Sequence, residues 1–369
     1  MYANMAGEVK HMKLRFPIVA CVVIALFAAL WAALVRVGWK MPALPTPIAG
    51  QHGALMISAF LGTLISLERA VALQRKWAYA APAFSALGGL ALIVGLPDEI
   101  GRGLMVLGSL GLVFVFGYIY RLHPTADVVT MALGAVMWLV GNVLWLFGES
   151  IYSAVPWWAG FLILTICGER LELSRVLWLK PSSRNYFKAA IGIFTTGLII
   201  SWFDLEIGLR VAGVGLIVLG VWLLRFDIAR HTIKKDGLTR YIAACLLPGY
   251  VWLIVAGVLW SVAGLRSSRL MMDAMLHTIF LGFVFSMIFG HAPIIVPALL
   301  PVDLTYRSIF YAPLVLMQGA LIVRVIADLT LNLTLRQWAG LFNVLAILLF
   351  LATMLFSAKR RPRDVALAA

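Results

Sequence analysis

Long runs of hydrophobic residues, broken by short polar segments, follow one another along almost the whole chain. The runs do not alternate polar and apolar positions as β-strands do, so they predict helices. Many of them reach about 20 residues, which is the length that a helix needs to cross the hydrocarbon core of a bilayer. We therefore expect an all-α fold, a polytopic membrane bundle of about twelve transmembrane helices.

The boundaries of these helices follow the prolines, glycines and charged residues that interrupt the apolar runs. The polar connections are all short, so we expect residues 1–369 to form a single membrane domain. The expected helices lie near residues 17–36, 51–73, 78–96, 102–121, 126–148, 155–178, 187–203, 208–225, 240–264, 271–293, 308–329 and 337–357.

The composition supports this interpretation, and it gives the net positive charge a different explanation from nucleic-acid binding. Hydrophobic residues make up 63% of the chain and charged residues only 12%, and the net charge is +14. A basic protein can bind nucleic acid, but here the cations form short clusters between apolar runs, such as Arg75-Lys76 and Lys234-Lys235. An N-terminus on the cytoplasmic side places 22 of the 30 Lys and Arg residues on that side. This bias predicts a multi-pass protein of the bacterial inner membrane with both termini in the cytoplasm.

Two histidines lie at corresponding depths of two expected helices. His52 opens the second helix and His277 lies one turn into the tenth, both at the periplasmic end in the expected orientation. Imidazole is a good axial ligand for haem iron, so the two side chains could ligate one iron. The alternative is that both are interfacial residues bonded to water or backbone. Small residues near them would leave room for a flat macrocycle: Gly53, Ala54, Ser58, Gly62, Thr278 and Gly282.

A third histidine, His291, lies fourteen residues after His277 in the same expected helix. In an α-helix this spacing places the two within ~40° of each other and ~21 Å apart along the axis. It is a candidate ligand for a second metal or cofactor, with copper as one choice. The alternative is a capping residue, because Gly290 and Pro293 indicate that the helix ends there.

Acidic and basic neighbours recur near the cytoplasmic ends of two expected helices. Glu68-Arg69 in the second helix and Glu169-Arg170 in the sixth have the same spacing from an aromatic-leucine pair, which suggests a weak internal repeat. Ionisable groups within a membrane are costly, so they are candidates for function. One interpretation is ion pairing between helices. The other is a proton or ligand path at the cytoplasmic mouth, which Glu172 and His291 would join.

Several chemistries lack their motifs. The chain has no Walker sequence, which argues against an ATP-driven pump, and no H-E-x-x-H. There is no C-x-x-C-H either, so any haem would be held without covalent bonds.

Twelve helices with histidines in the second and tenth resemble subunit I of the haem–copper oxidases. The segments Gln51-His52-Gly53-Ala54-Leu55-Met56 and Gly290-His291-Ala292-Pro293 are more similar to the NnrS family. The resemblance to the oxidases implies that His52 and His277 are the two axial ligands of a low-spin haem. The resemblance to the NnrS family implies a membrane protein with haem and copper, linked to nitric-oxide stress and denitrification. The sixth and seventh helices contain no histidine, so an oxidase-type binuclear centre is not expected.

Two classes of function therefore stand beside each other, and neither assigns a catalysed reaction. The first is a haem b protein that acts in nitric-oxide tolerance or carries electrons between quinol and a periplasmic partner. The alternative is a secondary transporter whose coupling site is formed by Glu68, Glu169 and the adjacent arginines. An assembly protein without a cofactor is a third possibility.

Overall fold

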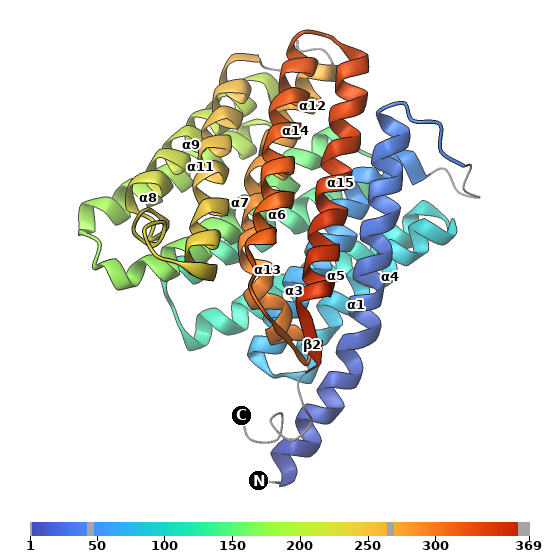
Figure 1. Cartoon of the computed structure of the whole chain (residues 1–369), viewed down its shortest axis with the longest axis vertical. Coiled ribbons are helices and arrows are strands. Elements are labelled where there is room, and N and C mark those ends of the chain that lie inside the picture. The colour runs from blue at the N-terminus through green and yellow to red at the C-terminus, as the bar shows by residue number, and fades with distance from the viewer. Residues whose placement is uncertain (1, 43–47, 264–268, 361–369) are drawn as a thin grey trace. The chain divides into compact units, whose positions relative to one another are not determined.

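The computed structural model describes the backbone of residues 2–42, 48–263 and 269–360, and the side chains of residues 14–42, 48–262 and 269–359 (Figure 1). Apart from two short strands, the described part is helical. The strands, β1 (Val302–Leu304) and β2 (Ala358–Arg360), pair antiparallel, with Asp303 opposite Lys359. The expectation of an all-α fold is therefore confirmed.

Eleven helices of the described part are long and apolar enough to cross a membrane. The expected helix over residues 308–329 coincides with a candidate span, Ser308–Leu329, and the other ten differ at their ends by a few residues. The long α-helices are α1 (Tyr2–Arg36), α3 (Thr63–Leu73), α4 (Ala80–Val94), α5 (Asp98–Leu122), α6 (Ala126–Leu146), α7 (Ile151–Leu173), α8 (Pro181–Ile200), α9 (Leu205–Phe226), α11 (Gly237–Ala263), α13 (Ser286–Leu299), α14 (Tyr311–Leu329) and α15 (Leu333–Ser357).

The twelfth expected span, residues 187–203, corresponds to α8, which begins earlier at Pro181. Proline suits this first helical position because its missing N–H would have no partner there. Arg184 and Lys188 lie in the first turns of α8. These charges explain why α8 falls outside the eleven apolar spans.

The helix that carries His277 and His291 continues beyond its expected end. The expectation that it ends near His291 is wrong, since α13 runs through Pro293 and Pro297 to Leu299. Proline removes one backbone hydrogen bond and bends a helix, but membrane helices accept it where neighbouring groups satisfy the released carbonyl.

Two helices contain a π-helical segment of eight residues, and each segment follows a histidine closely. After α2 (His52–Ala54) comes η2 (Leu55–Gly62), and after α12 (Arg269–His277) comes η5 (Thr278–Phe285). A π-helix bonds residue i to i+5, which winds more residues into each turn. The angle and distance expected for His277 and His291 assumed an unbroken α-helix, so that estimate was wrong.

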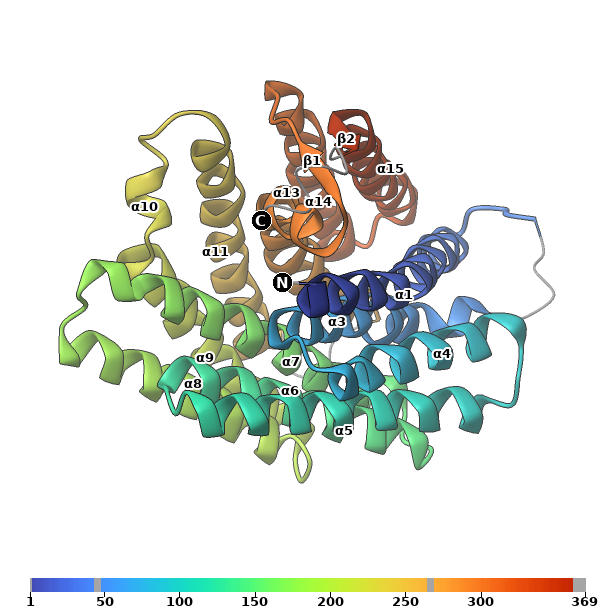
Figure 2. The same ribbon diagram turned by 90° about the horizontal axis from the view of Figure 1, so that it is seen from below.

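The chain divides into two compact units. The first comprises Met1–Phe161, Ile294–Leu304 and Ala358–Ala369, and the second Leu162–Pro293 and Thr305–Ser357. Within the first, α5 packs between α4 and α6 (Figure 2). In the same unit, α1 lies against η2. Within the second, α9 packs between α8 and α11, and α14 pairs with α15. The expectation of a single membrane domain stays a prediction.

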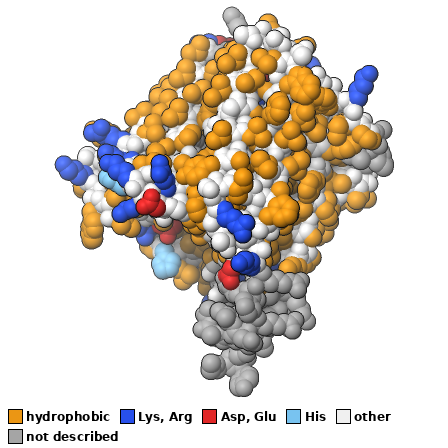
Figure 3. Space-filling model, in the orientation of Figure 1, with side chains coloured by type: hydrophobic (Ala, Val, Ile, Leu, Met, Phe, Trp, Pro, Cys, Tyr) orange, Lys and Arg blue, Asp and Glu red, His pale blue; other side chains and the backbone are white. Residues whose placement is uncertain are grey.

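Much of the outer surface is apolar, as expected for helices that face lipid. Figure 3 shows hydrophobic side chains over most of one face, with the charged ones gathered near its edges. Large apolar side chains such as Phe114, Val315 and Leu355 are more than half exposed. Water would penalise such a surface, whereas hydrocarbon does not.

Candidate functional site

His52 is oriented by the first transmembrane helix. Its Nδ1 lies 2.9 Å from the carbonyl oxygen of Ala29 in α1, and the side chain is half-buried. A carbonyl only accepts hydrogen bonds, so Nδ1 carries the proton in this contact. The lone pair of the neutral ring then lies on Nε2. This is the arrangement in which a metal-binding histidine presents Nε2, because the bond at Nδ1 fixes the tautomer.

His277 has the same arrangement in the second unit. Its Nδ1 lies 2.8 Å from the carbonyl oxygen of Asp273, one turn earlier in α12, and 3.4 Å from the Asp273 carboxylate. Its side chain is 17% exposed. The proton of a neutral His277 therefore lies on Nδ1, and Nε2 holds the lone pair.

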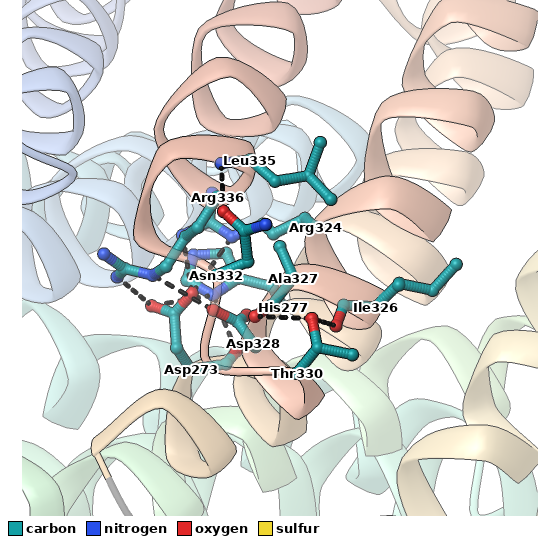
Figure 4. A network of polar contacts seen from close by, with 10 residues as sticks. All are labelled: Asp273, His277, Arg324, Ile326, Ala327, Asp328, Thr330, Asn332, Leu335 and Arg336. Atoms are coloured by element: carbon teal, nitrogen blue, oxygen red, sulfur yellow. Dashed lines mark hydrogen bonds and ion pairs between the residues drawn. The ribbon is translucent and has the colours of Figure 1, made fainter.

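Beside His277, four charged side chains from three helices form a network (Figure 4). Arg324 of α14 donates from Nε and Nη2 to Asp273 Oδ2, at 3.0 and 2.8 Å. Arg336 of α15 contacts two carboxylates, at 3.2 Å to Asp273 Oδ1 and 3.0 Å to Asp328 Oδ1. The contact between Arg336 and Asp328 is close, but its angle is not that of a directed hydrogen bond. Arg336 thus bridges two acids whose negative charges would otherwise repel each other.

The tight turn between α14 and α15 places Arg336 next to Asp328. Leu331 adopts the left-handed conformation, with φ of 58°, which is uncommon for a residue other than glycine. Asn332 then caps α15, because its Oδ1 accepts a hydrogen bond from the backbone of Leu335 at 3.0 Å. The chain reverses within a few residues, so Arg336 returns beside the end of α14.

The space near the predicted small residues is partly filled by tryptophan. A Cβ added to Gly62 would lie 2.2 Å from Trp138, and one added to Gly282 would lie 2.5 Å from Trp252. The room expected for a flat macrocycle at these two glycines is therefore occupied. Around Gly50 no atom lies within 4 Å of such a Cβ, and at Gly53 the nearest is Ile151 Cδ1 at 3.4 Å.

Hydrogen bonds hold both tryptophans in place. Trp138 Nε1 donates to Ser58 Oγ at 3.0 Å, and Ser58 donates to Asn142 at 3.0 Å. In the second unit, Trp252 Nε1 donates to Gln318 Oε1 at 2.6 Å, and Gln318 donates to Ser286 at 2.8 Å. In each unit a glycine at or within a π-helical segment thus packs against a tryptophan that is fixed by polar side chains.

A second charged cluster lies within the second unit, around Arg170 of α7. Arg170 pairs with Asp227, just after α9, through contacts of 2.8 and 3.3 Å, and both side chains are almost fully buried. Its Nη1 lies 3.0 Å from Nε2 of His291, whose Nδ1 contacts the Met287 carbonyl at 2.8 Å. Guanidinium only donates, so Nε2 of His291 accepts. A metal at this nitrogen would have to displace Arg170, and the metal role of His291 stays a prediction.

The acidic residues expected at a common mouth have different surroundings. Glu68 and Arg69 contact each other at 3.4 Å, and the Arg69 guanidinium lies 6.0 Å from the centre of the Phe116 ring. Glu169 is half-buried and Glu172 is exposed near the end of α7. Within the second unit, the structure joins Arg170 and His291. The expected path that would include Glu68, Arg69, Glu169 and Glu172 stays a prediction.

Sequence reasoning missed the carboxylates that neutralise these arginines. Asp227 follows an expected helix and lies in a connection to which the sequence assigns no role. Asp273 lies in the apolar run that contains His277, and Arg324 and Asp328 are four residues apart in another run. An acid and a base at this spacing share a helix face. That pattern was the available signal for the network.

Among the described residues, no three His, Cys, Asp or Glu side chains are grouped so that they could hold a metal ion. A haem iron needs at most two protein ligands, so this finding concerns centres formed from those residues rather than haem.

The fold and its apolar surface define a multi-pass α-helical membrane protein. The chain belongs to the family described as a domain of unknown function, DUF8744, which matches residues 15–359. No curated protein and no solved structure matches it.

Proposed function

We propose that this membrane protein binds haem b without covalent attachment and that His52 and His277 are axial ligands of its iron. The observation that carries the proposal is that the two rings make the same kind of hydrogen bond. Each directs Nδ1 to a backbone carbonyl, at 2.9 and 2.8 Å, so that Nε2 is the nitrogen suited to a metal.

The surroundings of the histidines add support. Both precede π-helical segments, which are rare and frequently occur at functional sites. Gly50 leaves open space close to His52 in the chain, whereas Gly62 and Gly282 do not provide the cradle that was expected.

A haem in this environment would supply one-electron redox chemistry. The resemblance to the NnrS family connects this chemistry with nitric-oxide stress and denitrification, or with electron transfer between quinol and a periplasmic protein. The bacterial inner membrane, with both termini in the cytoplasm, is the proposed location. Copper remains part of the proposal through the same resemblance.

Titration of the purified protein with haem b tests the proposal. We expect a Soret shift that saturates at a fixed ratio of haem to protein. The control for variants of His52 and His277 is His231→Ala, which removes an exposed histidine and should leave haem binding unchanged. The proposal would be overturned by haem that stays in the detergent phase and shows no saturable shift.

A second candidate is a secondary transporter, and the buried cluster of Arg170, Asp227 and His291 favours it. Buried ionisable groups within membrane proteins often mark ion pathways. The expected coupling site at Glu68 and Glu169 would then be centred on Arg170 instead. Proteoliposomes that carry a pH gradient test this candidate: wild-type protein should dissipate the gradient faster than Asp227→Asn, provided that both are equally folded.

A further inference from the structure

One end of the second unit carries a concentration of positive charge. Six cations lie within two short segments, residues 180–188 and 228–236, whereas Asp236 is the single acid there. All six are exposed, and Figure 3 shows Lys and Arg gathered on the side where Figure 1 places α8. The basic patch consists of Lys180, Arg184, Lys188, Arg230, Lys234 and Lys235.

Packing within the unit brings the two segments together. Trp222, near the end of α9, donates from Nε1 to the carbonyl oxygen of Ser183 at 2.8 Å, and its ring centre lies 4.7 Å from that of Phe187. The first turns of α8 therefore lie against the last turns of α9. The short helix α10 (Ala229–Thr232), which carries Arg230, follows α9 in the chain and packs against both α9 and α11.

The charges of this patch differ from those in the first turns of α9 and around the turn between α14 and α15. There, Arg210 pairs with Glu206 at 2.6 Å, and Arg324 and Arg336 pair with Asp273 and Asp328. In the two segments of the basic patch, six cations stand against one acid, which leaves an excess of five positive charges. Such an excess of positive charge attracts anionic groups from outside the protein.

The surroundings of the patch are those of a membrane interface. Trp178 is 90% exposed and Tyr186 is 64% exposed, and both lie close in sequence to the cations. Amphipathic aromatic residues concentrate where hydrocarbon meets headgroups. Val176, which is 70% exposed, precedes Lys180 by four residues in the chain.

We propose that the basic patch binds the phosphate-bearing headgroups of anionic phospholipids. The occupant is a lipid rather than a free phosphate, because the cations border apolar and aromatic side chains that an acyl chain would contact. Clusters of four to eight Lys and Arg next to a membrane helix commonly bind anionic lipids. The proposal does not depend on haem.

Binding of fluorescent phosphatidylglycerol to the full-length protein in detergent tests the proposal. We expect saturable binding that weakens by at least about tenfold in Lys180→Gln/Arg184→Gln/Lys188→Gln, since each cation near an anionic headgroup adds to affinity. The matched control is Arg75→Gln/Lys76→Gln/Arg121→Gln, which removes three exposed cations from the first unit and should bind like wild type.

Three results would overturn the proposal. The first is unchanged binding by the α8 variant, and the second is an equal loss in the control, which would mean that net charge alone attracts the lipid. The third is displacement of the lipid by millimolar inorganic phosphate, which would identify a free-phosphate site. Circular dichroism and gel filtration verify that each variant is folded. If the α8 variant does not fold, Lys234→Gln/Lys235→Gln tests the same patch from its other segment.

Discussion

Arg170 Nη1 lies 3.0 Å from Nε2 of His291, and this contact fixes the protonation of the histidine. Arginine cannot accept a hydrogen bond, so His291 accepts at Nε2 and keeps its proton on Nδ1, 2.8 Å from the Met287 carbonyl. The neutral imidazole and the charged guanidinium therefore lie side by side, with Asp227 as the counterion. Protonation of His291 would place two donors against each other and break the contact.

Removing the counterion of this cluster should be costly. Asp227→Ala leaves Arg170 buried and charged without its carboxylate, a change that typically costs about 3–5 kcal/mol. We expect a clear decrease in the thermal midpoint in detergent. Glu206→Gln, which breaks the half-exposed pair with Arg210, should change stability by less than about 1 kcal/mol. Equal midpoints for the two variants would contradict this role of Asp227.

Asp273 should be a sensitive member of the network beside His277. Asp273→Asn removes the carboxylate that contacts both Arg324 and Arg336, so we expect a loss of about 3–5 kcal/mol. Arg336→Met should be costly as well, because it leaves the buried Asp328 carboxylate without the cation that contacts it. Thermal unfolding of both variants beside Glu206→Gln in one detergent checks this, and a change by Asp273→Asn no larger than that of Glu206→Gln would contradict the role of Asp273.

The glycines that face tryptophan should resist even the smallest substitution. Gly62→Ala and Gly282→Ala place a methyl group 2.2 and 2.5 Å from Trp138 and Trp252, and such overpacking costs about 1–3 kcal/mol. Gly319→Ala in α14 is the control, since its added Cβ meets no atom within 4 Å. It should stabilise the helix by up to about 1 kcal/mol. The thermal unfolding midpoints of the three variants, measured side by side, test this prediction. Three equal midpoints would show that the two tryptophans do not constrain these glycines.

The proposed orientation makes α8 a spanning helix despite its charged first turns. Ser182 lies in the first turn of α8 and Phe203 lies just beyond its last residue, and both are exposed. In intact spheroplasts, Phe203→Cys should react with a membrane-impermeant maleimide, whereas Ser182→Cys should react only after lysis. Glu149→Cys, in the exposed connection between α6 and α7, should react like Phe203→Cys. Equal labelling of residues 182 and 203 would mean that α8 does not cross.

The positions of the helices could be predicted from the sequence because uninterrupted apolar runs near the bilayer thickness are typical of helices that cross a membrane. The expected helix over residues 308–329, for example, matches the candidate span Ser308–Leu329. The π-helical segments could not be predicted, because η2 and η5 have ordinary apolar sequences. Their backbone pattern depends on packing against other helices.

The charged networks were predicted in part. Arg170 and His291 were candidates, yet pairing partners depend on tertiary contacts that one sequence does not give. Asp227 lies in a connection and Asp273 in an apolar run, and the role of each becomes visible only when the fold places Arg170 and Arg324 next to them. The glycines show the same limit, because a small residue creates space only where no tryptophan fills it.

The reduced-minus-oxidised absorption spectrum of the purified, haem-supplied protein tests the central claim most directly. We predict a Soret band with sharp α and β bands on reduction, lost or shifted in His52→Ala and in His277→Ala and retained in His231→Ala. A spectrum without haem bands, or haem bands that persist unchanged in both His52→Ala and His277→Ala, would contradict the assignment of these histidines as ligands.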